Sequence, residues 1–416
     1  MAKQDYRPEV LLEDERGRGF PAVVRFGPYL FLSQSEGQRR LDTEAIDPAL
    51  SGKPEAQIRN SYGRIQRRLE QCGYAADCVV WLEHFVSSQE WLLLRLGLWR
   101  EYFGMERSTG GGAQARQPGL NLVSTVAVAV VPDLPRAAVT PAPTGPPAGI
   151  WAEQQRWVEA AYRPTFSLDG VRPPKAVQAG PLIFLIGVRG HAHPQTGERA
   201  PEEVPAAFPT QLRYSLDEFA LYLSPADVGV ADLVRVDAHV RNVNRAPEFR
   251  ATCQQYLGGP LPFAGYVVGM PVGGRGEMDV SAIAAARGVE TERAWLEGEP
   301  EQPQAVRAGP LIFVGACSGL RDAAGRGLRP DLYGDRAGQT RQALRRLEAA
   351  LQHFGADLSR VVRLDVFLRD VYFEEEFVRI AREVCGAHLP TLNVTGGDLQ
   401  DGAEVEVAAI AGAVGA

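Results

Sequence analysis

The chain has 416 residues, of which 45% are hydrophobic and 23% charged, and its formal net charge is −7 at pH 7. This composition indicates a soluble globular protein of two to four ordinary domains, without the basic excess of a nucleic-acid-binding protein. No apolar run is long enough to span a membrane, the N-terminus lacks the apolar core of a signal peptide, and the five cysteines are scattered. We therefore expect a cytoplasmic protein with reduced thiols and with neither a nucleic-acid nor a membrane partner.

One short apolar segment occurs three times along the chain. Ala179–Gly187 reads A-G-P-L-I-F-L-I-G, Ala308–Gly315 reads A-G-P-L-I-F-V-G, and Phe26–Ser33 is a looser copy, F-G-P-Y-L-F-L-S. Each copy opens on Gly-Pro, which predicts a turn followed at once by a buried strand.

Each copy is followed at a fixed distance by a second apolar segment and then by a closing glycine. From the glycine of Gly-Pro to the matching residue of the second segment the distance is 58, 59 and 58 residues, and the closing glycine comes 19 residues later in every copy. The matching residues are Phe85, His239 and Phe367, and the closing glycines are Gly104, Gly258 and Gly386. Such coincident spacing predicts three copies of one structural unit.

The first part of the chain divides into three segments. Residues 1–20 form a charged lead-in, residues 21–132 form the first unit, and residues 133–164 form a proline-rich linker with a short helical piece. The elements predicted in the first unit are strand 26–33, helix 55–72, strand 78–86, helix 88–103 and closing strands near 119–131.

The second unit spans residues 165–285, with a helix near 212–223 before strand 232–243. Residues 286–303 form a connector rich in Glu and Pro, and residues 304–416 form the third unit.

The third unit has the clearest pattern. Its helix, Gln339–His353, places apolar residues on one face and ends before Gly355. The apolar residues of that face are Ala343, Leu344, Leu347, Ala350 and Leu351. In its central strand, alternation predicts Val362, Leu364, Val366 and Leu368 on one face and Arg363 and Asp365 on the other.

These patterns predict an α+β fold built three times. Each unit has a mixed sheet with two helices on one face, and the second face of each sheet must be buried elsewhere. Three linked copies can bury these faces against one another around a pseudo-threefold axis. We therefore expect an intramolecular pseudo-trimer that remains a monomer or pairs as a dimer.

The order of these motifs resembles the Rid/YjgF (L-PSP) superfamily. The resemblance rests on the Gly-Pro-Leu-Ile-Phe strand, on G-A-D-L-S-R-V-V-R-L-D-V-F-L-R-D at Gly355–Asp370 and on V-E-V-A-A-I-A at Val405–Ala411, and it covers about 330 residues. It implies three tandem Rid-like units of chorismate-mutase-like fold, with ligand clefts between the units. It also implies hydrolysis of imines or enamines without a metal or organic cofactor.

In that family an Arg two residues after a Pro holds the substrate carboxylate, and a Glu on the last strand orients the attacking water. Counted from Pro118, Pro262 and Pro390, the Arg positions hold Leu120, Ala264 and Leu392. The Glu positions fall at Ser281, at Ala408 and near Val128. The resemblance therefore predicts that the usual deaminase pair is missing from every unit.

Other acids and one thiol are candidates for catalysis. Asp279 and Glu406 precede the vacated Glu positions by two residues, and hence share their strand face. Cys317 is a candidate nucleophile in the loop after the opening strand of the third unit, and Glu36 is the ionisable group of the equivalent loop in the first. The alternatives are rim carboxylates and a buried, inert thiol.

Candidates for substrate binding lie in the same loops and beside the vacated Arg positions. Arg321 and Arg189 suit a substrate carboxylate, and Asn121 and Asn393 suit hydrogen bonds to a ligand. The alternatives are solvated loop arginines and asparagines that cap turns. His191 and His193 have no Cys or acidic partner at ligand spacing, so we expect no metal site.

Three functions fit these features. The leading hypothesis is a Rid-like, cofactor-independent enzyme of specialised metabolism that acts on a small imine, enamine or carboxylated intermediate in a cleft between units. A chorismatase-like hydrolase is the second, and it requires Arg and acidic residues in one cleft. The third is a non-catalytic small-molecule-binding or scaffold protein. Because tandem copies diverge, we expect at most two clefts to keep a working pocket.

Overall fold

The computed structural model contains three six-stranded sheets, each with two helices against it. It describes residues 6–14, 17–41, 45–88, 91–104, 107–117, 121–140, 173–203, 206–272, 276–298, 300–324 and 327–415. Within these ranges, no helix combines the length and the apolar character that crossing a bilayer requires.

The first unit has six strands and two helices. In chain order they are β1 (Glu9–Leu12), β2 (Val23–Phe26), β3 (Tyr29–Glu36), α1 (Pro54–Gln71), β4 (Val79–Val86), α2 (Trp91–Phe103), β5 (Thr109–Gln114) and β6 (Val123–Val130). The strand order is β1-β2-β3-β6-β4-β5, in which β4 and β5 are parallel and the other neighbours antiparallel.

The second and third units repeat this plan. The second consists of β7 (Arg136–Thr140), β8 (Ala176–Ala179), β9 (Leu182–Val188), α4 (Ala207–Leu223), β10 (Leu233–Val240), α5 (Ala246–Leu257), β11 (Ala264–Gly269) and β12 (Met278–Ala285). The third consists of β13 (Thr291–Ala294), β14 (Ala305–Ala308), β15 (Leu311–Ser318), α6 (Arg336–Gln352), β16 (Val361–Leu368), α7 (Glu374–Cys385), β17 (Thr391–Gly396) and β18 (Val405–Gly412). Their strand orders, β7-β8-β9-β12-β10-β11 and β13-β14-β15-β18-β16-β17, match that of the first unit.

Three segments that we assigned to connections each supply an edge strand. The lead-in contains β1, the linker 133–164 contains β7 and the connector 286–303 contains β13. Each of these strands pairs with the first strand of the hairpin that follows it. The short helical piece predicted in the linker lies outside the described residues.

One predicted strand of the first unit was wrong. We expected the first closing strand near residue 119, whereas β5 lies earlier, at Thr109–Gln114. Its sequence, T-G-G-G-A-Q, has no apolar alternation, and it is held in the sheet by parallel pairing with β4. Pro118 and Leu120 lie outside the described residues.

The three Gly-Pro motifs are hairpin turns, as predicted. They join β2 to β3, β8 to β9 and β14 to β15. Gly27, Gly180 and Gly309 have φ angles of 54°, 59° and 55°. Glycine adopts this left-handed conformation without steric cost, so the second strand begins directly after the turn.

The helices cover one face of each sheet. All five apolar residues predicted on the inner face of α6 are buried in the core of the third unit. One side-chain hydrogen bond ties helix to sheet in every unit, from the backbone N–H before the last strand to a glutamine oxygen on the first helix. The pairs are Leu122 with Gln57, Glu277 with Gln211 and Glu404 with Gln339.

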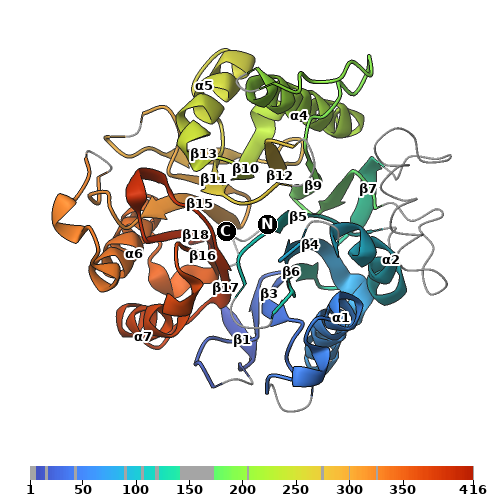
Figure 1. Cartoon of the computed structure of the whole chain (residues 1–416), viewed down its shortest axis with the longest axis vertical. Coiled ribbons are helices and arrows are strands. Elements are labelled where there is room, and N and C mark those ends of the chain that lie inside the picture. Colours follow the sequence, from blue (N-terminus) through green and yellow to red (C-terminus); the bar gives the residue numbers. More distant parts are fainter. Residues whose placement is uncertain are drawn as a thin grey trace.

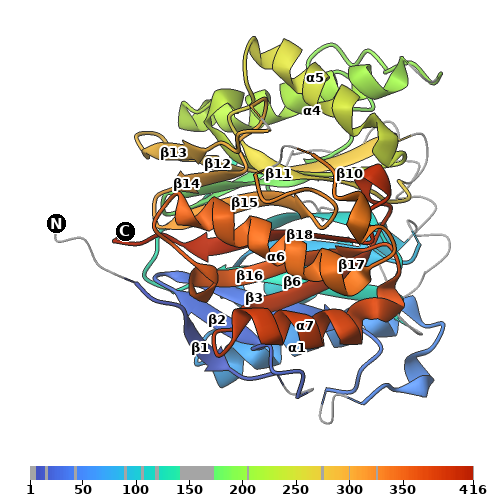
Figure 2. The same ribbon diagram turned by 90° about the vertical axis from the view of Figure 1, so that its left-hand side faces the viewer.

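The second faces of the sheets meet at the centre of the molecule, with the helices outside (Figure 1). Figure 2 shows the sheets stacked between the helices of different units. Phe31, Phe184 and Phe313, one from each unit, belong to a single apolar cluster there. The predicted pseudo-trimer within one chain is therefore confirmed.

A β-bulge corrects one predicted strand face. The pairing of β16 with β18 shifts between Val361 and Arg363, and equivalent shifts occur in β4 and β10. Val362 therefore belongs to the inter-unit cluster, while Leu364 and Val366 belong to the core beneath the helices. A bulge adds one residue to a strand and so reverses the alternation from that point.

Charged side chains are buried at the centre. Arg235 donates hydrogen bonds to Asp237 at 2.7 Å and to Asp365 at 2.8 Å. Arg363 donates to Asp365 at 2.8 Å and to Glu83 at 2.9 Å. These residues come from the central strands of all three units, so the network joins the units around the axis.

Trp81 stands in the first unit where the other two units have Arg235 and Arg363. Among the described residues the network therefore holds three carboxyl groups and two guanidinium groups. Burial and the neighbouring carboxylates raise the pKa of Asp237, which has one guanidinium partner, to about 7. Despite its burial, the two guanidinium groups beside Asp365 hold the pKa of that carboxyl below its usual value.

Candidate functional site

Three clefts lie where the edge strand of one unit faces the second hairpin strand of the next. We call them the 1/2 cleft, between β5 and β9, the 2/3 cleft, between β11 and β15, and the 3/1 cleft, between β17 and β3. Each cleft has one residue that lies seven positions after the hairpin glycine of its unit. This residue is Gln34 in the 3/1 cleft, Gly187 in the 1/2 cleft and Ala316 in the 2/3 cleft. On the last strand of the same unit, the equivalent residues are Ser124, Asp279 and Glu406.

A cavity of about 290 Å³ occupies the 2/3 cleft. The second unit, the connector and the third unit all contribute to its lining. The residues are Arg250, Gly265, Tyr266, Val267, Gly298, Pro300, Glu301, Gln302, Pro303, Gln304, Gly315, Ala316, Ser318, Arg321, Arg346, Gln400, Asp401 and Glu406. Two residues predicted from the sequence, Glu406 and Arg321, therefore share one cavity.

Two glycines bring bare backbone to the floor of this cavity. A Cβ atom on Gly315 would lie 2.8 Å from the carbonyl oxygen of Gly265. A Cβ atom on Gly265 would lie 1.7 Å from the carbonyl oxygen of Val236. Neither position accepts a side chain in this backbone, so the two strands approach each other closely where they line the cavity.

The edge of β11 presents a backbone donor to the cavity. Val267 is equivalent to Val394 of β17, whose N–H donates to the Gln34 side chain in the 3/1 cleft at 2.9 Å. In the 2/3 cleft the residue equivalent to Gln34 is Ala316, which has no side-chain oxygen. Val267 itself lines the cavity. A ligand oxygen fits that position.

Glu406 places a carboxylate in the cavity wall. It lies on β18, opposite Ser318 of β15 and Phe367 of β16, so strands on both sides fix its backbone. Its side chain is 2% exposed. Because sheet positions hold side chains more precisely than loops do, Glu406 is well placed to act on a bound molecule.

Three arginines approach the cavity from different elements. Arg321 pairs with Asp401 at 2.7 Å, and both are about one-third exposed. Arg346 on α6 is buried and donates to the backbone oxygen of Asp322 at 2.7 Å. Arg250 reaches the cavity from α5 of the second unit. With three carboxylates also in the lining, the cavity suits a carboxylated molecule that also carries a hydrogen-bond donor.

Cys317 lies beside this cavity and does not line it. Its side chain is fully buried and belongs to the apolar core of the third unit. Its sulfur lies 3.6 Å from Nε2 of Gln304 and 3.5 Å from the carbonyl oxygen of Gly315. The structure therefore places this candidate nucleophile away from the cavity surface.

The 1/2 cleft is closed by an ion pair. Nε of Arg189 donates to Oδ2 of Asp279 at 2.8 Å, so two predicted site residues bind each other. A Cβ atom on Gly187 would lie 2.8 Å from Oδ1 of Asp279 and 3.1 Å from Cα of Gly111. Arg95 of α2 adds a hydrogen bond to the Gly111 oxygen at 2.7 Å. The two strands thus approach each other closely beside the ion pair of Arg189 with Asp279.

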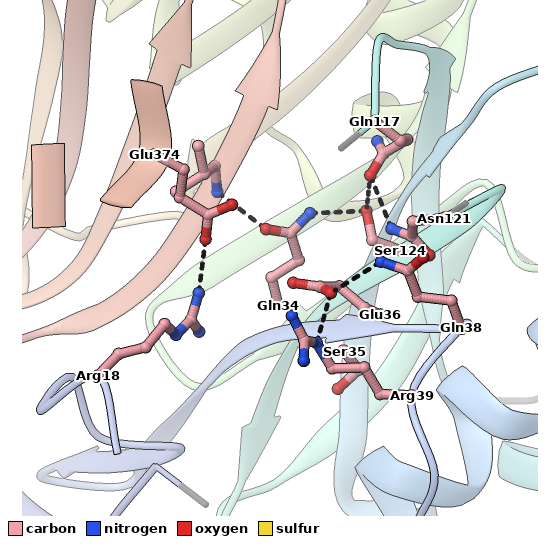
Figure 3. Close-up of polar contacts among 12 residues, drawn as sticks. Arg18, Gln34, Ser35, Glu36, Gln38, Arg39, Gln117, Asn121, Ser124 and Glu374 are labelled. Atoms are coloured by element: carbon pink, nitrogen blue, oxygen red, sulfur yellow. Dashed lines mark hydrogen bonds and ion pairs between the residues drawn. The ribbon is translucent and has the colours of Figure 1, made fainter. Parts of the chain in front are cut away.

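The 3/1 cleft is filled by polar side chains (Figure 3). Nε2 of Gln34 donates to the Ser124 hydroxyl at 2.7 Å. Glu36 accepts a hydrogen bond from Nε of Arg39 at 2.7 Å. These contacts bind the side chains that line this cleft to one another.

The two predicted asparagines lie in different places. Asn121 donates to Gln117 at 3.0 Å in the 3/1 cleft (Figure 3). Asn393 donates to Asp365 at 3.1 Å and so belongs to the central charge network. Neither residue lines the cavity of the 2/3 cleft.

The two histidines of the second unit have separate surroundings. His191 is partly buried near Arg189, and these two causes lower its pKa to about 4. Nε2 of His193 lies 3.7 Å from Oδ2 of Asp217. No group of three or more His, Cys, Asp or Glu side chains in the described part of the chain is arranged to hold a metal ion.

The strand registers also revise the positions that correspond to the family's Glu. Val126 pairs with Glu83, as Ser281 pairs with Asp237 and Ala408 with Asp365. The first unit therefore has Val126 at this position, two residues before Val128, near which we expected it.

The position of the family's Arg shifts in a similar way. Thr391 pairs with Arg363 and Ala264 with Arg235, so Leu392 is equivalent to Gly265 and not to Ala264. In the first unit the parallel strand is β5, where the equivalent residue is Gly110.

The sequence interpretation missed one side of the cavity. Arg250 comes from the second unit and Glu301 from the connector, and no local pattern marks either as a neighbour of Glu406. Arg346 offered one signal, because it is a basic residue beside the apolar positions of helix α6.

Residues 302–413 match the model of a family described as Endoribonuclease L-PSP. The matched residues lie in the third unit, which is therefore similar to that family. The first and second units repeat the strand order of the matched unit, so the whole chain is three tandem units of one fold.

Solved structures are similar to this chain in part or over most of its length. Rv2704 from Mycobacterium tuberculosis, a member of the YjgF/YER057c/UK114 family, is 29% identical, and the match covers 30% of this chain and 99% of that chain with a TM-score of 0.25. Yeast Mmf1 is 19% identical, with coverage of 30% and 96% and a TM-score of 0.25. A chorismatase is 14% identical, with coverage of 80% and 93% and a TM-score of 0.49. No curated protein sequence matches this chain.

Proposed function

We propose that the 2/3 cleft binds a small carboxylated imine or enamine and that Glu406 catalyses its hydrolysis. The observation that carries this proposal is the place of Glu406. Of the three equivalent residues, Asp279, Ser124 and Glu406, it is Glu406 that lines the 290 Å³ cavity together with arginines.

Binding follows from the chemistry of the lining. The guanidinium groups of Arg321 and Arg250 suit a substrate carboxylate, since arginine binds carboxylates through paired hydrogen bonds. The Val267 N–H suits a second acceptor oxygen. Ligand pockets commonly measure about 300–1,000 Å³, so a cavity of about 290 Å³ favours a small metabolite.

The reaction needs one proton acceptor that later becomes a donor. Glu406 takes a proton from water while the water oxygen bonds to the imine carbon, the electron pair of the C=N double bond passes to nitrogen, and the carboxyl group gives that proton to the nitrogen. Glu406 then takes the hydroxyl proton of the resulting carbinolamine as C=O forms and the C–N bond breaks, and it gives this proton to the departing ammonia. One water is consumed and one ammonia is released. An enamine enters the same route after tautomerising to the imine.

A chorismatase-like hydrolase is a second candidate. The grouping of Arg250, Arg321 and Arg346 with Asp401 and Glu406 in one cavity favours it, because that substrate carries two carboxylates. Here water adds to the enol ether, the bond between the ring oxygen and the enol carbon breaks, and pyruvate is released. The same carboxyl group, Glu406, is suited to move the proton.

Both candidates are tested with the purified chain. We expect it to release ammonia from 2-aminoacrylate generated in situ, or pyruvate from chorismate, faster than the spontaneous reaction. Glu406→Gln lowers kcat by about 10²–10³-fold, because the proton acceptor is lost. Glu383→Gln, the same change on the exposed side of α7, leaves kcat unchanged. Equal turnover by Glu406→Gln and the unaltered chain contradicts this role. Absence of turnover with both substrates contradicts both enzymatic proposals and favours a binding protein.

A further inference from the structure

The side chain of Gln34 occupies the position in the 3/1 cleft that a bound ligand would take. Gln34 of the first unit crosses the 3/1 cleft, accepting a hydrogen bond from the Val394 N–H of the third unit at 2.9 Å. On its other side it donates to the Ser124 hydroxyl at 2.7 Å. Its side chain is 3% exposed. A single planar amide group therefore bridges the edge strand of one unit and the last strand of the next.

The 2/3 cleft has residues at the same two positions on the edge strand and the last strand, but no glutamine side chain between them. Val267 is equivalent to Val394, and Glu406 is equivalent to Ser124. Ala316 stands in place of Gln34, and the space that a longer side chain would fill is the cavity. On the facing strand the two clefts therefore differ at this position, with Gln34 in the 3/1 cleft and Ala316 in the 2/3 cleft.

We propose that Gln34 is a built-in ligand that closes the 3/1 cleft, and that removing its side chain opens a second binding site for small primary carboxamides. The amide of Gln34 presents one acceptor oxygen and one N–H donor from a planar centre, so the opened site takes molecules with that arrangement. The inference concerns a cleft other than the proposed active site, and it stands whether or not the 2/3 cleft is catalytic.

The surroundings of Gln34 would remain polar without it. The Ser124 hydroxyl donates onward to Gln117 at 3.0 Å, and Gln117 also accepts from Asn121. Loss of the Gln34 amide leaves the Val394 N–H without its acceptor in a buried place, which is costly. A small amide restores that hydrogen bond, whereas an apolar molecule does not.

The chain itself supplies the substitutions for a test. Gln34→Gly introduces the residue that the 1/2 cleft has at this position, and Ala316→Gln introduces the residue of the 3/1 cleft. The probe is propionamide, which is the excised glutamine side chain, and its control is N,N-dimethylpropionamide, which lacks the N–H donor. Binding is followed by ligand-observed NMR and by the thermal midpoint.

We expect the unaltered chain to bind propionamide in the 2/3 cleft, Ala316→Gln to lose this binding, and the double variant Gln34→Gly/Ala316→Gln to regain it in the 3/1 cleft. At saturating propionamide the midpoint of the double variant rises by about 2–4 °C. The dimethyl compound produces no rise.

Two results overturn the proposal. One is undiminished propionamide binding by Ala316→Gln, and the other is a double variant that responds equally to both amides. If Ala316→Gln does not fold, Gln34→Gly alone decides the question, with two propionamide sites expected and one site contradicting the inference. None of these readouts requires turnover, so they are independent of the Glu406→Gln result.

Discussion

Asp237→Asn is expected to stabilise this protein above pH 7, although it alters a buried carboxylate that pairs with arginine. Trp81 replaces the third arginine of the central network, so Asp237 has one guanidinium partner while Asp365 has two. Burial and the nearby carboxylates raise the pKa of Asp237 from 3.8 to about 7. The folded chain therefore favours the protonated, neutral form of this side chain.

The size of the effect follows from this pKa. Each tenfold change in proton affinity is worth about 1.4 kcal/mol, so a rise from 3.8 to about 7 corresponds to about 4 kcal/mol. The stabilisation that the folded chain gains from protonated Asp237 is fully present below the unfolded pKa, near pH 4. It is lost as the pH rises through the folded pKa of about 7. Asparagine resembles the protonated form at every pH. Relative to the unaltered chain, Asp237→Asn gains little near pH 4 and up to about 4 kcal/mol at pH 8.

Asp365→Asn is the matched control, because the same chemical change falls on the equivalent strand position. The pKa of Asp365 is held down by Arg363 and Arg235, so its stabilising effect is present above its unfolded pKa. Removing that charge leaves two buried guanidinium groups with a weaker partner and costs about 3–5 kcal/mol at pH 8.

Equilibrium urea unfolding between pH 4.5 and 8.5 measures both differences, and subtracting each variant from the unaltered chain removes the contribution of the buried histidines. If the two variants change stability in the same direction at pH 8, the account of the central network is wrong.

Two further predictions concern the helix–sheet contact and the cavity. Gln339→Ala removes the acceptor of the partly buried Glu404 N–H and is expected to lower the free energy of unfolding by about 1–3 kcal/mol, measured by urea denaturation; an unchanged midpoint would show that this hydrogen bond is dispensable. Arg250→Ala is expected to weaken binding of a carboxylated ligand about tenfold, as measured by calorimetry, while the unfolding midpoint stays the same, because the arginine contributes to the cavity and little to the core.

The triplicated unit was predictable because its signals are local. A left-handed glycine before proline, the length of a strand and the glycine that follows a helix are read within a few residues, and their spacing survives divergence elsewhere. The inner face of α6 was predictable for the same reason. Prediction failed at β5, which has no apolar alternation and exists through pairing with β4, and at Val362, where a bulge reverses the faces of the strand.

The candidate site was predictable only in part. Sequence alone pointed to Glu406, Arg321, Arg189 and Asp279, because short polar interruptions follow the opening strands or lie on the last ones. The sequence did not show which of these four residues line a cavity, because that depends on the residues of another unit that pack against them.

Tertiary structure decided which cleft is open. Arg189 binds Asp279 in one cleft, Gln34 spans the second, and in the third the small residue Ala316 lines a cavity together with Glu406. The local sequence determined three similar strands and helices, because turns and periodicity act over short distances. The packing of distant segments determined the site, because hydrogen bonds and ion pairs form between whichever groups the ring brings together.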